Sequence, residues 1–149
     1  LLMEVLIHHV DVLRFLLGPT ELLGSVISSD TDAIKGEDRA TLLMRTRAGA
    51  AVTLVGDFMA HGHPAAQVDQ LEILGTKGAI RLNGDRLTLC HGDQTAQSIT
   101  FDLQANYKAS YAGAITHFLD CLASGAGFET DPADNLQTLE IIERAYSSS

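Results

Sequence analysis

The sequence predicts an α+β fold in which helices pack on one side of a predominantly antiparallel, open-faced sheet. An apolar helical pattern opens the chain, strand and turn signals fill residues 21–103, and two further helical patterns close it. The strands follow one another through short turns, as antiparallel hairpins do, instead of alternating with helices. We therefore expect a single domain over residues 1–149.

The first helix is predicted over residues 2–17 and ends at Gly18-Pro19, a common stop signal. Its apolar residues point in almost every direction, so we expect it to be buried on most sides. The chain begins inside this pattern without a Met or a cap residue, and it stops just after the last helix. We therefore expect it to be a fragment of a longer protein.

The central region should form strands joined by tight turns. Ala48-Gly49 and Asn83-Gly84 are typical of hairpins, and Gly75 to Gly78 fits a turn better than a phosphate cradle. The expected strands cover residues 22–28, 39–47, 51–58, 68–74, 79–82, 86–90 and 98–103. Apolar residues on both faces of the second and third strands predict a covered outer face: Leu42, Leu43, Met44, Val52, Leu54 and Val55.

Two helices are predicted at the end of the chain. The first ends near Gly125, and the second begins at Asp131-Pro132, a cap residue followed by proline at the first helical position. Helical spacing predicts that each buries one stripe, Tyr111, Ile115, Phe118 and Leu122 in the first and Leu136, Leu139, Ile142 and Tyr146 in the second.

The composition excludes several classes of function. Ten Lys and Arg face 19 Asp and Glu, a formal net charge of -9, and no basic cluster interrupts this acidity, so nucleic acid is an unfavourable partner. No apolar run approaches the roughly 20 residues that a membrane-spanning helix needs. No secretory signal opens the chain. The isolated Cys90 and Cys121 lack metal-ligand spacing, and we expect two reduced cysteines in a cytoplasmic protein.

A polar stripe on the first helix is the main chemical signal. Glu4, His8 and Asp11 have the spacing i, i+4, i+7, which places them within roughly 60° of one another on an α-helix. An imidazole can take the proton of an alcohol, and a carboxylate one turn away can fix its tautomer. We expect the three side chains to face a shared cavity. Equally, Glu4–His8 and Asp11–Arg14 fit structural pairs on a partly exposed helix, and spacing alone leaves both interpretations open.

Residues 4–18 resemble the opening of the C-terminal domain in the glucose–fructose oxidoreductase and inositol dehydrogenase (Gfo/Idh/MocA-type) family. That family has an acid, a His four residues later and an Asp seven residues later, followed by an apolar helix that ends in Gly. Further similar segments follow in the family's order and extend the resemblance over nearly the whole chain: residues 37–40, the strand-turn-strand of residues 71–80, Phe118, residues 130–134 and residues 141–147.

The resemblance implies the substrate-binding, acid–base half of a dehydrogenase that acts on a secondary alcohol of a sugar or polyol. His8 matches the catalytic histidine, Glu4 the carboxylate before it, and Asp11 a substrate-contacting or helix-anchoring acid. We place His9 and His61 among the candidate substrate contacts.

The resemblance also implies partners. NAD or NADP would be bound by a separate N-terminal nucleotide-binding domain, since neither a Gly-x-Gly-x-x-Gly loop nor a Glu-Lys-Pro segment occurs here. We expect no cofactor-binding or metal-binding residues in this fragment, no bound cofactor, and no turnover by the fragment alone. Family members commonly pair through the sheet, which implies a homodimer or tetramer.

Two departures from the family pattern leave alternatives open. The family usually has Asp at the position of Glu4, and often a small residue at the position of Leu6, where we expect leucine to narrow the space beside the nicotinamide. These departures favour a non-catalytic binding or oligomerisation module with the same fold. A third alternative is a metal-dependent enzyme that uses His61, His63 and His8.

Overall fold

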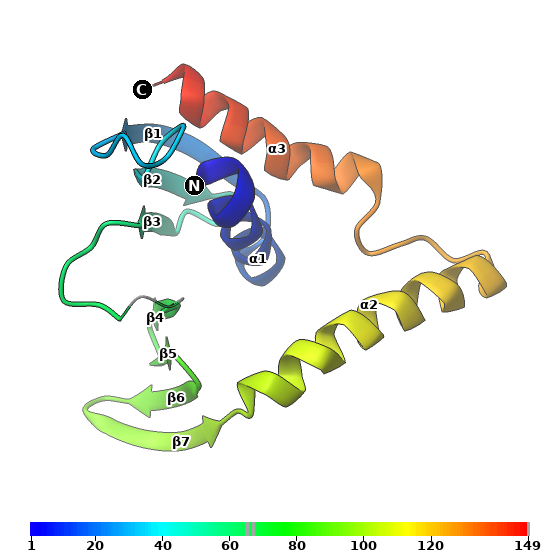
Figure 1. Ribbon diagram of the computed structural model, residues 1–149. Helices are drawn as coiled ribbons and strands as arrows, with labels where there is room; N and C mark the ends of the chain where they lie inside the picture. Colours follow the sequence, from blue (N-terminus) through cyan, green and yellow to red (C-terminus); the bar gives the residue numbers. More distant parts are fainter. Residues whose placement is uncertain (65, 67, 149) are drawn as a thin grey trace. The chain divides into compact units, whose positions relative to one another are not determined.

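The computed structural model describes residues 1–64, 66 and 68–148, and these form two compact units (Figure 1). The first unit comprises Leu1–His61 together with Glu129–Ser149, and the second comprises Gly62–Phe128. Each unit contains an antiparallel sheet and at least one α-helix, which confirms the predicted α+β class. Among the described residues, no helix has the length and apolar character needed to cross a bilayer.

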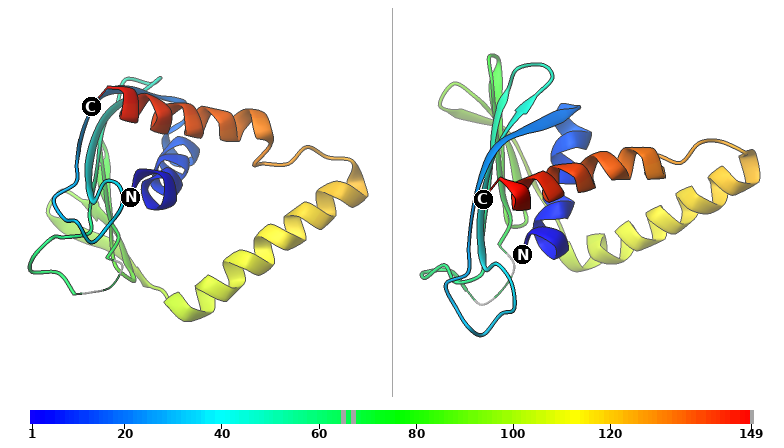
Figure 2. Two further views of the ribbon diagram at one scale, coloured as in Figure 1. Left: turned by 45° about the horizontal axis from the view of Figure 1, so that its top comes forward. Right: turned by 90° about the horizontal axis from the view of Figure 1, so that it is seen from above.

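The first unit is a three-stranded antiparallel sheet, of order β1-β2-β3, with two helices on one face (Figure 2). Its elements are a π-helical turn η1 (Leu2–Leu6), α1 (Ile7–Leu17), β1 (Thr20–Ser28), β2 (Arg39–Thr46), β3 (Ala51–Asp57) and α3 (Pro132–Ser147).

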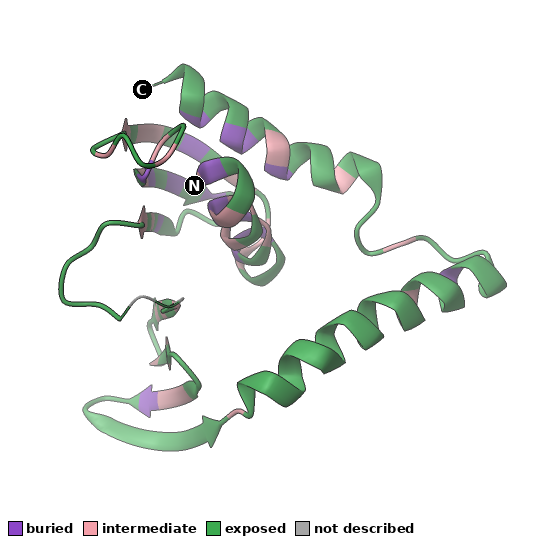
Figure 3. Cartoon of the chain, viewed as in Figure 1, coloured by how far each residue is buried: buried purple, intermediate pink, exposed green. Residues whose placement is uncertain are grey.

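The core of this unit lies between the sheet and its helices (Figure 3). Strand β2 alternates between the two faces, because successive side chains of a strand point in opposite directions. Ala40, Leu42 and Met44 are fully buried, whereas Leu43 lies on the outer face and is exposed. The buried apolar residues that the helices contribute are Leu2, Leu6, Val10 and Leu13 from the first helix and Ile141, Ile142 and Ala145 from α3.

One expectation for these helices was wrong, and the other holds only at Ile142. The first helix buries one face only, and Phe15 on another face is 81% exposed. Helix α3 buries Thr138, Ile141, Ile142 and Ala145, whereas Leu136 is exposed and Leu139 is half-buried. Helical periodicity locates a stripe only to within one residue, and the contact with the sheet decides which flank faces inward.

The second unit is a four-stranded antiparallel meander, of order β4-β5-β6-β7, and a long helix. The Gly75–Gly78 turn is confirmed, and these two residues pair across it. The next hairpin turn falls at Gly84-Asp85, one residue later than predicted, because Asn83 pairs with Arg86. The elements of the second unit are β4 (Gln70–Gly75), β5 (Gly78–Asn83), β6 (Arg86–His91), β7 (Gln94–Thr100) and α2 (Leu103–Ser124).

The strand predicted over residues 98–103 is shorter at its C-terminal end. Asp102 caps α2 by accepting a hydrogen bond from the Ala105 amide at 3.0 Å, so Leu103 opens the helix instead of closing a strand. The cap overrides the alternation of apolar and polar residues that suggested a strand. Helix α2 ends at Ser124, which confirms the predicted end near Gly125, and Gly125 itself is in the left-handed conformation. Its expected buried stripe is exposed: Tyr111, Ile115, Phe118 and Leu122 are each more than half accessible.

Candidate functional site

The exposed face of the first helix carries Glu4 and His8. Both side chains lie at the surface, Glu4 within the π turn and His8 in the first turn of α1. Within the described part of the chain, His8 makes no hydrogen bond or ion pair. Its imidazole is therefore available to a ligand.

Asp11 has a different environment, because it belongs to a cluster that joins α1 to α3. The Thr138 hydroxyl donates to Asp11 Oδ1 at 3.0 Å, and the Arg14 guanidinium lies 3.7 Å from the same oxygen. Arg14 is only 8% exposed. It donates to Thr138 Oγ1 at 2.6 Å and to Asp134 Oδ1 at 2.7 Å. Of the two roles implied for Asp11, these contacts support that of a helix-anchoring acid.

The other two candidate substrate contacts lie apart from this stripe. His9 is half-buried, and its Nδ1 lies 3.0 Å from the Val5 carbonyl oxygen, one turn earlier. His61 is exposed beyond the end of β3. The pKa of Asp57 is lowered mainly by the Met59 amide, with contributions from Arg39 and, more weakly, from His61. No group of three or more potential metal ligands occurs among the described residues.

The π turn changes the geometry on which the sequence argument relied. The amides of Val5 and Leu6 both donate to the Leu1 carbonyl, at 2.9 and 3.1 Å, and the second of these bonds spans five residues. A π turn has more residues per turn than an α-helix, so it rotates Glu4 relative to His8. On a regular α-helix, Glu4 and His8 would point in directions roughly 40° apart, and that angle does not apply here.

Leu6 does not face a ligand. Its side chain is 3% exposed and packs against Gly56 of β3. A Cβ at position 56 would lie 2.8 Å from a terminal carbon of Leu6, so glycine leaves the room that leucine fills. The expectation that Leu6 narrows a nicotinamide site was wrong, and one argument for a non-catalytic module is removed.

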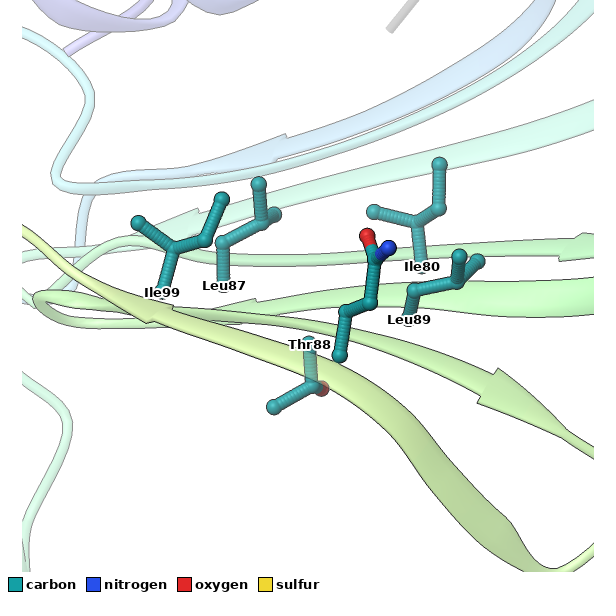
Figure 4. A pocket seen from close by; sticks show the side chains of 6 residues that line it. Ile80, Leu87, Thr88, Leu89 and Ile99 are labelled. Carbon is teal, nitrogen blue, oxygen red and sulfur yellow. The ribbon is translucent and has the colours of Figure 1, made fainter.

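The two best-defined hollows among the described residues lie on the second unit, and neither includes Glu4, His8 or Asp11, so the expected shared cavity stays a prediction. One, of about 190 Å³, is lined by residues of β5, β6 and β7 (Figure 4). Ile80, Leu87, Leu89 and Ile99 project from one face of the sheet. The other, of about 350 Å³, adjoins it around Ile73, Lys77 and His91. The first hollow is lined mainly by aliphatic side chains, and the second also includes Thr76, Lys77 and His91.

The N-termini of the helices do not fit the phosphates of a dinucleotide. Such phosphates are typically held by unpaired amides at a helix N-terminus. Here the Glu37 carboxylate accepts from the Leu2 amide, Asp102 from the Ala105 amide and Asp131 from the Asp134 amide. The Gly75–Gly78 turn connects two paired strands and opens no helix. At each of these helix N-termini a carboxylate accepts a hydrogen bond from a backbone amide.

Several polar residues with structural contacts were not predicted from the sequence. Glu37 and Asp38 were noted only within a segment similar to the family, yet Asp38 is fully buried and accepts from the Asp30 and Thr31 amides at 2.8 Å. Tyr146 and Thr138 bind partners more than 100 residues away in the chain. No local spacing could have identified these contacts.

The whole chain, residues 1–149, matches the family described as the C-terminal alpha/beta domain of the Gfo/Idh/MocA-type oxidoreductases, and it belongs to that family. It is 32% identical to D-apiose dehydrogenase from Paraburkholderia graminis over 155 residues, which cover 96% of this chain and 41% of the relative. D-apiose dehydrogenase from Rhizobium rhizogenes is also 32% identical, with 96% of this chain and 44% of the relative covered. The chain thus spans less than half the length of these relatives.

Solved structures show the same fold. An oxidoreductase from Agrobacterium radiobacter, in complex with NAD+, L-tartaric acid and magnesium, superposes with a TM-score of 0.85 at 29% identity, over 99% of this chain and 46% of that one. A levoglucosan dehydrogenase in complex with NADH and levoglucosan gives a TM-score of 0.83 at 20% identity, over 97% of this chain and 47% of that one. The second comparison concerns the fold alone.

Proposed function

We propose that this chain is the substrate-binding and acid–base half of an NAD(P)-dependent oxidoreductase that acts on a secondary alcohol of a sugar or polyol. The observation that carries the proposal is the exposed, unpaired His8 on a helix that the Asp11–Arg14–Thr138 cluster holds to α3. A general base must be accessible to the substrate hydroxyl and must be held in place, and the exposure of His8 and the anchoring of its helix support this role.

In this reaction His8 accepts the proton of the substrate hydroxyl as the C–H bond breaks. Glu4 stabilises the resulting imidazolium, and Asp11 holds the helix in place. An oxidised nicotinamide bound by the other half of the parent protein would accept the hydride. His9 and His61 remain predicted substrate contacts, and substrate binding between the halves explains why this half alone should not turn over.

The decisive experiment is performed in the full-length parent protein, with D-apiose first among a panel of sugars and polyols because of the relatives at 32% identity. His8→Ala should lower kcat/KM by about a hundredfold or more. His91→Ala is the matched control, since Nδ1 of His91 lies 2.7 Å from the Lys77 carbonyl oxygen. Turnover by His8→Ala at the level of the control would exclude His8 as the base.

The outer face of the β1–β3 sheet supports self-association. The register places Val26, Thr41 and Val55 side by side across the three strands, and the two valines are 71% and 61% exposed. Ion pairs flank this apolar band, Arg39 with Asp57 on one side and Arg45 with Glu21 on the other. We propose that a second copy of the chain covers this face, because an exposed apolar patch with a polar rim is typical of a protein–protein interface.

Sedimentation tests this assembly. The parent protein should be a dimer or tetramer at micromolar concentration, and Val55→Asp should shift it towards monomer because a carboxylate would be buried without a partner. Leu136→Asp, on an exposed position of α3, is the control. A monomeric parent, or an oligomer that Val55→Asp leaves intact, would contradict the assignment of this face.

A further inference from the structure

Two residues from distant parts of the chain form hydrogen bonds with the π turn η1, which precedes the α-helix that carries His8. Glu37 Oε1 accepts from the Leu2 amide at 2.7 Å. The Tyr146 hydroxyl donates to the same oxygen at 2.8 Å, and the backbone of Met3 hydrogen-bonds to Tyr146 in turn. Glu37 and Tyr146 therefore bind the backbone of Leu2 and Met3 inside the π turn.

Charge and burial favour this arrangement. The Glu37 side chain is only 13% exposed. Burial alone would raise the pKa of Glu37, but hydrogen bonds from Tyr146 and from backbone amides outweigh it and lower the pKa to about 2. Burial, reinforced by the Glu37 carboxylate, raises the pKa of Tyr146 to about 12. The pair is thus a carboxylate and a neutral phenol throughout the neutral range.

The capped residues are also the ones that form the π turn. The Leu2 amide donates to Glu37, and the Leu1 carbonyl accepts both the Val5 and the Leu6 amides. An isolated π turn is rarely stable by itself, and an alternative α-helical winding would change the rotation of the residues that follow the cap. Glu4 lies inside this turn, and His8 lies two residues beyond its end.

We infer that Glu37 and Tyr146 are a positioning pair, which holds the π turn and thereby sets the directions in which Glu4 and His8 project toward the substrate. This inference rests on the proposed role of His8. Neither residue touches substrate, and the pair acts through the backbone of the helix. Because misplacing a catalytic group by about 1 Å can reduce the rate a hundredfold, loss of the cap should lower kcat more than it raises KM.

The test uses the full-length enzyme with its cofactor and compares Tyr146→Phe, Glu37→Ala and Glu37→Gln. Glu37→Ala and Tyr146→Phe should lower kcat by about tenfold or more while KM changes by less than about threefold. Glu37→Gln keeps an oxygen that accepts from the Leu2 amide and should restore most of kcat. The matched controls, Glu140→Gln and Tyr111→Phe, should have unaltered kinetics.

The outcomes separate this inference from the proposed function. If His8→Ala retains activity, the base assignment fails and the positioning role fails with it. If His8→Ala is inactive but Tyr146→Phe and Glu37→Ala keep kcat within twofold, only the positioning role is overturned. It is also overturned if activity falls only in step with the folded fraction and Glu37→Gln gives no rescue. Should Glu37→Ala fail to fold, Tyr146→Phe and Glu37→Gln decide the question by the same criteria.

Discussion

Replacing Arg14 with methionine would remove the guanidinium that joins α1 to α3 while keeping most of the aliphatic stem in place. Arg14 makes two short charge-assisted hydrogen bonds, to Asp134 Oδ1 at 2.7 Å and to Thr138 Oγ1 at 2.6 Å. Each such bond contributes about 1.5 to 3 kcal/mol, and breaking a fully buried ion pair costs about 3 to 5 kcal/mol.

Solvent reduces the expected loss. The side chains of Asp11 and Asp134 are 42% and 45% exposed, so water solvates both carboxylates once the arginine is gone. We therefore expect Arg14→Met to lower the free energy of unfolding by about 2 to 3 kcal/mol. Part of this loss of stability should come from the contact with Asp134. A double-mutant cycle between Arg14 and Asp134 should therefore give an interaction energy of about 1 kcal/mol.

Urea unfolding followed by far-UV circular dichroism at neutral pH measures these energies. Arg47→Met is the control, because Arg47 is exposed and its side chain makes no hydrogen bond or ion pair within the described part of the chain. A loss below about 1 kcal/mol for Arg14→Met, or a cycle with no coupling, would refute the claim that this cluster anchors the helix.

Two further predictions concern acid stability and backbone packing. The pKa of Glu37 is lowered from 4.5 to about 2, so its contribution is complete above pH 4.5 and is lost as the pH falls toward 2. The difference corresponds to about 3 kcal/mol at most, and Glu37→Gln should flatten the decline in unfolding free energy over this range; an unchanged pH slope would contradict it. Gly78→Ala should cost about 2 kcal/mol, because its Cβ would lie 2.6 Å from the Cys90 carbonyl oxygen on the paired strand. By contrast, Gly113→Ala in α2 should stabilise by about 0.5 to 1 kcal/mol, since its Cβ meets nothing within 4 Å and alanine favours helix. Thermal melts that rank these two variants in the opposite order would show the packing argument to be wrong.

Local patterns were sufficient for much of the fold. The Gly49 hairpin, the Gly75–Gly78 turn and the Asp131 cap of α3 all lie where turn and cap residues predict them. In each case the decisive interaction joins residues only a few positions apart, so the information is contained in a short window of sequence. Where two local signals competed, as at Asp102, the cap prevailed over the strand pattern.

For the candidate site, too, local sequence predicted some features and tertiary contacts decided the others. Sequence by itself identified the helix with Glu4, His8 and Asp11 and, through the resemblance of nearly the whole chain, the family to which it belongs. It could not tell which acid anchors the helix, because Asp11 meets Thr138 across 127 positions. Nor could it reveal the cap by Glu37 and Tyr146, which are 109 positions apart, or that Leu6 fills the room left by Gly56. These contacts depend on how the helices lie on the sheet, and tertiary packing alone brings such distant residues within hydrogen-bonding distance.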